Sequence, residues 1–134
     1  MLKNLMYVGV YVSDQERALA FYTETLGLTK RFDNPTPWGR FLTVAPADDS
    51  IQILLWPGTP GQGTGLSEEP GTVPGPIFLE SDDLAADFQQ LRSRGVTFEE
   101  SEPTGYPFGL RLTALDPDGN RIALRQPGPS QGDW

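Results

Sequence analysis

The sequence contains no histidine and no cysteine among its 134 residues. Histidine is the commonest metal ligand and the commonest general base in enzymes, so any metal site or acid–base catalysis in this protein would have to use other residues. The absence of cysteine excludes disulfides, thiolate metal sites and cysteine nucleophiles.

Long apolar runs and positive charge are also scarce. No segment approaches the ~20 consecutive apolar residues of a membrane-spanning helix, and the N-terminal stretch lacks the cleavage site of a signal peptide. The 18 acidic residues outnumber the 10 lysines and arginines, which gives a net charge of −8. Such a surface repels phosphate backbones. We therefore expect a cytoplasmic protein whose partners include neither nucleic acid nor a membrane.

The sequence predicts the same order of strands and helices in both halves of the chain. Met6–Val12 alternates apolar and polar positions and is rich in β-branched residues, which predicts a strand. A capping box follows, with Ser13 as the N-cap and Glu16 three residues later. Apolar residues at helical spacing then predict a helix that Gly27 ends.

The same order returns in the second half of the chain. Ile77–Glu80 is a short strand, Ser81–Asp83 is a cluster of capping residues, and Gly95 ends the next predicted helix. The distance between the repeats, Asp14 to Asp83, is 69 residues. The back halves of the two copies also match, since each ends in two strands around a polar turn: Trp38–Val44, Ala47–Ser50 and Ile51–Leu55 in the first copy, and Phe108–Ala114, Asp116–Asn120 and Ile122–Arg125 in the second.

The sequence thus predicts two βαβββ modules in one domain spanning residues 1–134. A stretch rich in Gly, Pro and Thr separates the modules and is typical of a linker or loop. We place module one at about residues 4–56, the linker at 57–75, module two at about 76–126 and a tail at 127–134.

Two motifs resemble the vicinal oxygen chelate superfamily, which includes glyoxalase I, extradiol dioxygenases and bleomycin resistance proteins. They are YVGVYVSDQERALAFYTETLGL near the N-terminus and LDPDGNRIAL near the C-terminus, and the resemblance runs from about Leu5 to Gln126. It implies an α+β fold in which two repeated βαβββ modules form a U-shaped mixed sheet around a cleft, with helices on the outer face. It also implies a homodimer.

Enzymes of this superfamily hold a divalent metal on the first and last strands of each module, mostly with His and Glu. The resemblance places Tyr7 and Pro76 at the first-strand positions and Gln52 and Ala123 at the last-strand positions. A proline and an alanine offer no ligand, and an amide with a tyrosine does not make a set of three or four good ligands. We therefore expect a protein with no metal and no cofactor.

Strand alternation gives the side chains that would face the cleft. They are mainly aromatic, with a few polar groups, whereas the opposite faces are aliphatic and should pack under the helices. Arg111 lies on a strand whose alternation is ambiguous. The candidate ligand-binding residues are Tyr7, Tyr11, Gln52, Leu54, Trp56, Phe78, Arg111, Ala123 and Arg125.

An aromatic cleft with few polar groups is typical of a small-molecule site, and we expect a hydrophobic or aromatic ligand there. The net charge would favour a cationic ligand. Alternatively, the aromatic residues fill the cleft or a dimer interface. A second function is a lyase, isomerase or dioxygenase with an altered metal site or metal-free acid–base chemistry, for which a buried Glu80 is the catalytic candidate. A non-catalytic interaction module is the third.

Overall fold

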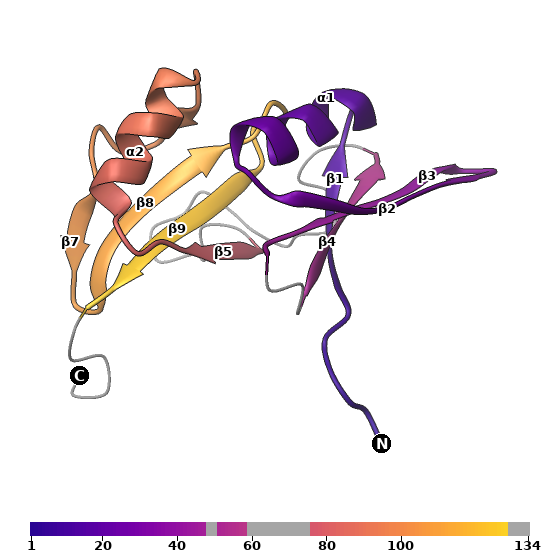
Figure 1. The fold of residues 1–134 in the computed structure, drawn as a ribbon, viewed down its shortest axis with the longest axis horizontal. Helices are drawn as coiled ribbons and strands as arrows, with labels where there is room; N and C mark the ends of the chain where they lie inside the picture. Colours follow the sequence, from indigo (N-terminus) through magenta and orange to yellow (C-terminus); the bar gives the residue numbers. More distant parts are fainter. Residues whose placement is uncertain (48–50, 59–75, 129–134) are drawn as a thin grey trace. The chain divides into compact units, whose positions relative to one another are not determined.

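The computed structural model describes residues 1–47, 51–58 and 76–128. The chain divides into two compact units, residues 1–65 and 66–134, whose boundary falls within the predicted linker. Most of that linker, part of the predicted turn Ala47–Ser50 and most of the predicted tail lie outside the described residues. Each unit is described by itself, and Figure 1 shows the elements of both.

Unit 1 has the predicted βαβββ order. Its sheet has the strand order β1-β4-β3-β2, in which β1 is parallel to β4 and the other pairs are antiparallel. The elements are β1 (Tyr7–Val12), α1 (Gln15–Ala20), η1 (Phe21–Thr25), β2 (Thr29–Thr36), β3 (Gly39–Ala45) and β4 (Gln52–Pro57).

The first helix begins one residue later than the capping box predicts. Asp14, and not Ser13, is the N-cap: its backbone is extended, and its side chain accepts a hydrogen bond of 3.1 Å from the backbone N–H of Arg17. Glu16 therefore occupies the second helical position and pairs instead with Arg40 on β3. After Ala20 the helix widens into the π-helical turn η1, which the sequence pattern did not predict.

Unit 2 repeats the plan with its second strand split in two. β6 and β7 pair with opposite ends of β8, so they share one edge of a sheet whose remaining order is β5-β9-β8. Asp83 caps the helix by accepting from the backbone N–H of Ala86 at 3.1 Å. The elements are β5 (Ile77–Glu80), α2 (Leu84–Ser93), β6 (Thr97–Phe98), β7 (Thr104–Tyr106), β8 (Gly109–Leu115) and β9 (Arg121–Pro127).

Each helix covers one face of its own sheet; Figure 1 shows α2 lying along β8 and β9. The aliphatic side chains of that face form the core, as alternation predicts. Ile51 is an exception, because it precedes β4 and is 39% exposed. The core residues include Val10, Val12, Tyr22, Leu42, Val44, Ile53 and Leu55 in unit 1, and Ile77, Leu84, Phe88, Leu112, Ala114, Ile122 and Leu124 in unit 2.

The predicted turn after β8 is present and is held by one buried carboxylate. Asp116 accepts hydrogen bonds from the backbone N–H groups of Asp118 (2.9 Å) and Asn120 (2.8 Å), and from the Asn120 amide (2.9 Å). These bonds fix the corner from which β9 leaves. The turn therefore sets the register that places Ala123 and Arg125.

Candidate functional site

The strand register confirms which predicted residues share a face. In unit 1, Tyr7 lies opposite Gln52 and Tyr11 lies opposite Trp56. In unit 2, Phe78 lies opposite Ala123. Residues directly opposite each other on neighbouring strands project from the same side of a sheet. Each unit therefore has a sheet face directed away from its helix, which we call the open face, and the candidate residues lie on these two faces.

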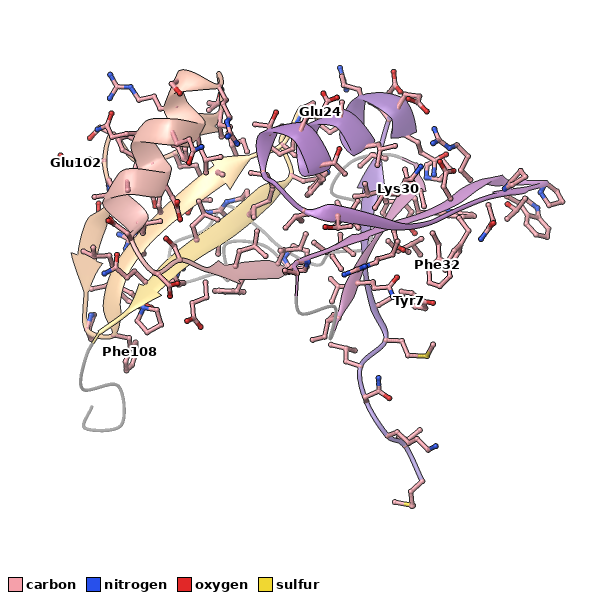
Figure 2. The ribbon with its side chains drawn as sticks, viewed as in Figure 1. Tyr7, Glu24, Lys30, Phe32, Glu102 and Phe108 are labelled. Carbon is pink, nitrogen blue, oxygen red and sulfur yellow. The ribbon has the colours of Figure 1, made fainter. Side chains whose placement is uncertain are left out.

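The open face of unit 1 carries a row of aromatic rings. Tyr7 contacts Phe41 edge to face, with ring centroids 5.5 Å apart, and Phe41 lies 6.4 Å from Phe32. Figure 2 shows Tyr7 and Phe32 on the side of the sheet away from α1. The other predicted residues of this face, Tyr11, Leu54 and Trp56, are half-buried.

The side chain of Gln52 forms a hydrogen bond within this face. Its side-chain oxygen accepts a 2.7 Å hydrogen bond from the hydroxyl of Thr43. That hydroxyl in turn accepts from the backbone N–H of Phe32 at 3.1 Å, where the pairing of β2 with β3 shifts register. The neutral amide oxygen of Gln52 is thus the hydrogen-bond acceptor of a buried threonine.

The residues at the family's ligand positions do not fit a metal. Ala123 is fully buried and presents only a methyl group. In the register of β5 with β9, the residue opposite Ala123 is Phe78. Phenylalanine offers no ligand either. Across the described ranges, no three acidic, histidine or cysteine residues gather as metal ligands would.

The open face of unit 2 is built around Arg125. Its guanidinium carbon lies 5.2 Å from the ring centroid of Phe78 on β5 and 5.4 Å from that of Tyr106 on β7. Tyr106 contacts Phe108 edge to face at 5.7 Å. These distances fall within the ~6 Å range of cation–π interactions. One cation therefore lies against two aromatic rings that come from different strands.

Two charged candidates flank this group. Register resolves the ambiguous position of Arg111: it pairs with Arg125 and so lies on the open face, where it reaches Glu100 at 3.5 Å. Glu80 lies opposite Arg125 and is exposed. The acid–base role considered for Glu80 required burial, and the structure contradicts that condition.

Sequence reasoning missed several members of both faces. Phe32 lies on β2, whose proline and charged residues mask alternation, and Tyr106 lies on β7, which is only three residues long. Phe41 and Thr43 lie on a strand that was predicted, and counting alternate residues along it would have found them. No local signal marks Glu100, whose carboxylate accepts from the backbone N–H of Thr113 at 2.7 Å across the gap between β6 and β7.

Comparison with known proteins places this fold. The family model described as the glyoxalase/bleomycin resistance protein/dioxygenase superfamily matches residues 4–124. The chain belongs to this superfamily. A relative in Bacillus subtilis, the protein YetH, is 30% identical over 127 residues, which span 94% of this chain and 100% of YetH.

Comparison with solved structures agrees with this assignment. TnmS3, an antibiotic binding protein from Streptomyces sp. CB03234, is 35% identical with a TM-score of 0.75, over 95% of this chain and 98% of TnmS3. A superfamily member from Sphaerobacter thermophilus is 34% identical with a TM-score of 0.78, over 93% of this chain and 98% of that protein. Within the described residues of our superfamily member, no helix is long and apolar enough to cross a bilayer.

Proposed function

We propose that this superfamily member binds a hydrophobic or aromatic small molecule on its open sheet faces and does so without a metal. The observation that carries the proposal is the pair Phe78 and Ala123. The family's ligand position holds a buried methyl group, and the residue opposite it is a phenylalanine that is 52% exposed. The likeness to TnmS3, an antibiotic binding protein, supports the same function.

The exposed ring supplies a driving force for such binding. An aromatic side chain buries 150–250 Å² when fully covered, so covering the exposed half of Phe78 removes on the order of 100 Å² from water. At about 25 cal/mol per Å², this contributes roughly 2.5 kcal/mol. Tyr7 and Phe41 offer further ring surface on the open face of unit 1.

A thermal-shift screen with flat aromatic and hydrophobic compounds tests the binding. We expect some of them to raise the melting temperature of the wild type, because a ligand that binds only the folded state stabilises it. Phe78→Ala should weaken the response. The control is Ile51→Ala, which shortens an exposed apolar side chain that precedes β4. A broad screen with no hit, or equal responses from both variants, would contradict the proposal.

Metal content tests the second half of the proposal. We would incubate untagged protein with Mn²⁺, Fe²⁺, Ni²⁺ or Zn²⁺, desalt it and measure bound metal by elemental mass spectrometry. We expect under about a tenth of an equivalent, because the ligand positions lack suitable donors. Near-stoichiometric binding of a metal would contradict the metal-free proposal and favour a metal-dependent enzyme. A homodimer remains part of the proposal, and light scattering at micromolar concentration tests it.

A further inference from the structure

The hydrogen bonds of Arg125 leave part of its guanidinium unused. Nη1 donates to the backbone carbonyls of Leu124 at 3.0 Å and Leu112 at 3.5 Å. Nε and Nη2 have no acceptor among residues 1–47, 51–58 and 76–128. An arginine has five N–H donors in a fixed fork, and Nε with Nη2 is one of the edges that receives a carboxylate with two parallel bonds. That edge of Arg125 has no partner among the described residues.

Within the described part of the chain, the charge of Arg125 also lacks a carboxylate partner. Glu80 is directly opposite in the register, yet none of the described acidic residues has an oxygen within 4 Å of this guanidinium. The neighbouring Arg111 adds a second cation to the same row, and its only described ion pair, with Glu100, is 3.5 Å long. The open face of unit 2 thus carries Arg125 and Arg111 beside the carboxylates of Glu80 and Glu100, and only Glu100 forms a described ion pair with either arginine.

We propose that the ligand of this face is a planar aromatic molecule carrying an anionic group, a carboxylate or a phenolate, that Arg125 binds through its Nε–Nη2 edge. This inference rests on the proposed function and narrows its ligand class. Phe78 and Tyr106 hold the guanidinium between them, so the fork is oriented before the ligand arrives. The aromatic part of the ligand then covers the exposed surface of Phe78.

This ligand class differs from the cation that the overall acidity favours. Charges separated by more than about 8–10 Å are largely screened at physiological ionic strength, so the nearest charged groups dominate. Here the nearest group with an unused hydrogen-bonding edge is Arg125. A charged hydrogen bond that forms in a partly desolvated site favours the anion over a neutral isostere by about ten-fold or more.

Three probes of one shape separate charge from ring contact: 2-naphthoate, the neutral 2-naphthamide and the cationic 2-naphthylmethylammonium. Dissociation constants would be measured by calorimetry or by NMR titration on the full chain. We expect 2-naphthoate to bind about ten-fold more tightly than 2-naphthamide, and the ammonium probe to bind most weakly. Equal affinities, or a preference for the ammonium probe, would overturn the inference and leave the proposed function standing.

Variants then assign the preference to one residue. Arg125→Gln should lose the ten-fold preference for 2-naphthoate and keep its affinity for 2-naphthamide within about two-fold, whereas Arg125→Lys should keep part of it. The matched control is Arg92→Gln, since Arg92 also lies over a phenylalanine, Phe88 at 5.8 Å, but stands on helix α2. A preference that survives Arg125→Gln, or that Arg92→Gln also abolishes, would overturn the inference. Failure of all three probes to bind at millimolar concentration would count against the proposed function itself.

Discussion

Arg40 in unit 1 and Arg125 in unit 2 both stand on inner strands of their sheets, but they project from opposite faces. Arg40 lies on the helix side, where it forms two bonds with Asp33, at 2.9 and 2.6 Å, and a third with Glu16 of α1. Arg125 lies on the open face, between two rings and without a described carboxylate partner. One arginine therefore joins elements of the fold, while the other has an Nε–Nη2 edge with no acceptor among the described residues.

The two sheets also differ in how far their last two strands stay paired. β8 and β9 pair at seven consecutive positions, from Gly109–Pro127 to Leu115–Arg121. β3 and β4 pair only at Thr43–Leu54 and Val44–Ile53. Beyond these two pairs, the side-chain amide of Gln15 on α1 bridges the two strands in place of backbone hydrogen bonds. It donates to the carbonyls of Arg40 (2.7 Å) on β3 and Leu55 (2.9 Å) on β4. Unit 1 thus uses a helix side chain where unit 2 uses continuous backbone.

Two repeat-related glycines should reveal this difference most strongly. Gly39 and Gly109 both have positive φ, 141° and 138°, but a β-carbon on Gly109 would stand 2.1 Å from the backbone oxygen of Gln126. On Gly39 its nearest neighbour would be the side chain of Pro57, at 2.7 Å. We expect Gly109→Ala to cost about 4 kcal/mol and Gly39→Ala about 2 kcal/mol. Urea unfolding measures both, and equal costs would contradict the contrast.

The fold was largely predictable from sequence because its signals are local. Alternation in Tyr7–Val12 and Ile77–Glu80, the caps before the helices and the turn at Asp116 each depend on a few neighbouring residues. The strands that were missed are β2, whose proline and charged residues mask alternation, and β6 and β7, which are too short to show any. They form because a paired neighbouring strand supplies their hydrogen bonds.

The candidate site was predictable only in part, because its grouping depends on register. Sequence placed Phe78 and Arg125 on one face, but nothing local indicates that Tyr106 reaches the same guanidinium from β7. Nor does any local signal show that Glu80, directly opposite Arg125, forms no ion pair with it. Such contacts arise from pairing over long sequence separations, which a single sequence does not specify.

The ion pairs of Arg40 predict a pH-dependent difference between the units. The hydrogen bond from Arg40 is the main reason that the pKa of Asp33 lies below its usual value. A carboxylate with a lowered folded-state pKa contributes stability above its unfolded pKa of about 4 and loses it as the pH falls through the folded value. Asp33→Asn should therefore lower the melting temperature at pH 7 by about 5 °C, and the difference should shrink as the pH falls below the unfolded value of about 4.

The control for this measurement is an acidic residue of unit 2. Asp82→Asn makes the same change of charge at an exposed position that has no described ion pair. It should shift the melting temperature by under about 1 °C at either pH. A similar shift in both variants would mean that net charge, rather than the pair with Arg40, sets the effect.

The smallest expected difference concerns the two buried threonines, Thr43 and Thr113, which lie at repeat-related positions. The Thr43 hydroxyl satisfies the backbone N–H of Phe32 and donates to Gln52, so Thr43→Val leaves a backbone donor unpaired. The Thr113 hydroxyl only adds a 3.2 Å bond to Glu100, whose carboxylate keeps its 2.7 Å bond from the backbone N–H of Thr113 after Thr113→Val. We expect costs of about 1 kcal/mol for Thr43→Val and about 0.5 kcal/mol for Thr113→Val, measured by urea unfolding. A larger cost for Thr113→Val would show that the position of Glu100 depends on the Thr113 hydroxyl. The hydroxyl, and not the backbone N–H of Thr113, would then be the main anchor of Glu100 at the edge of β8 between β6 and β7.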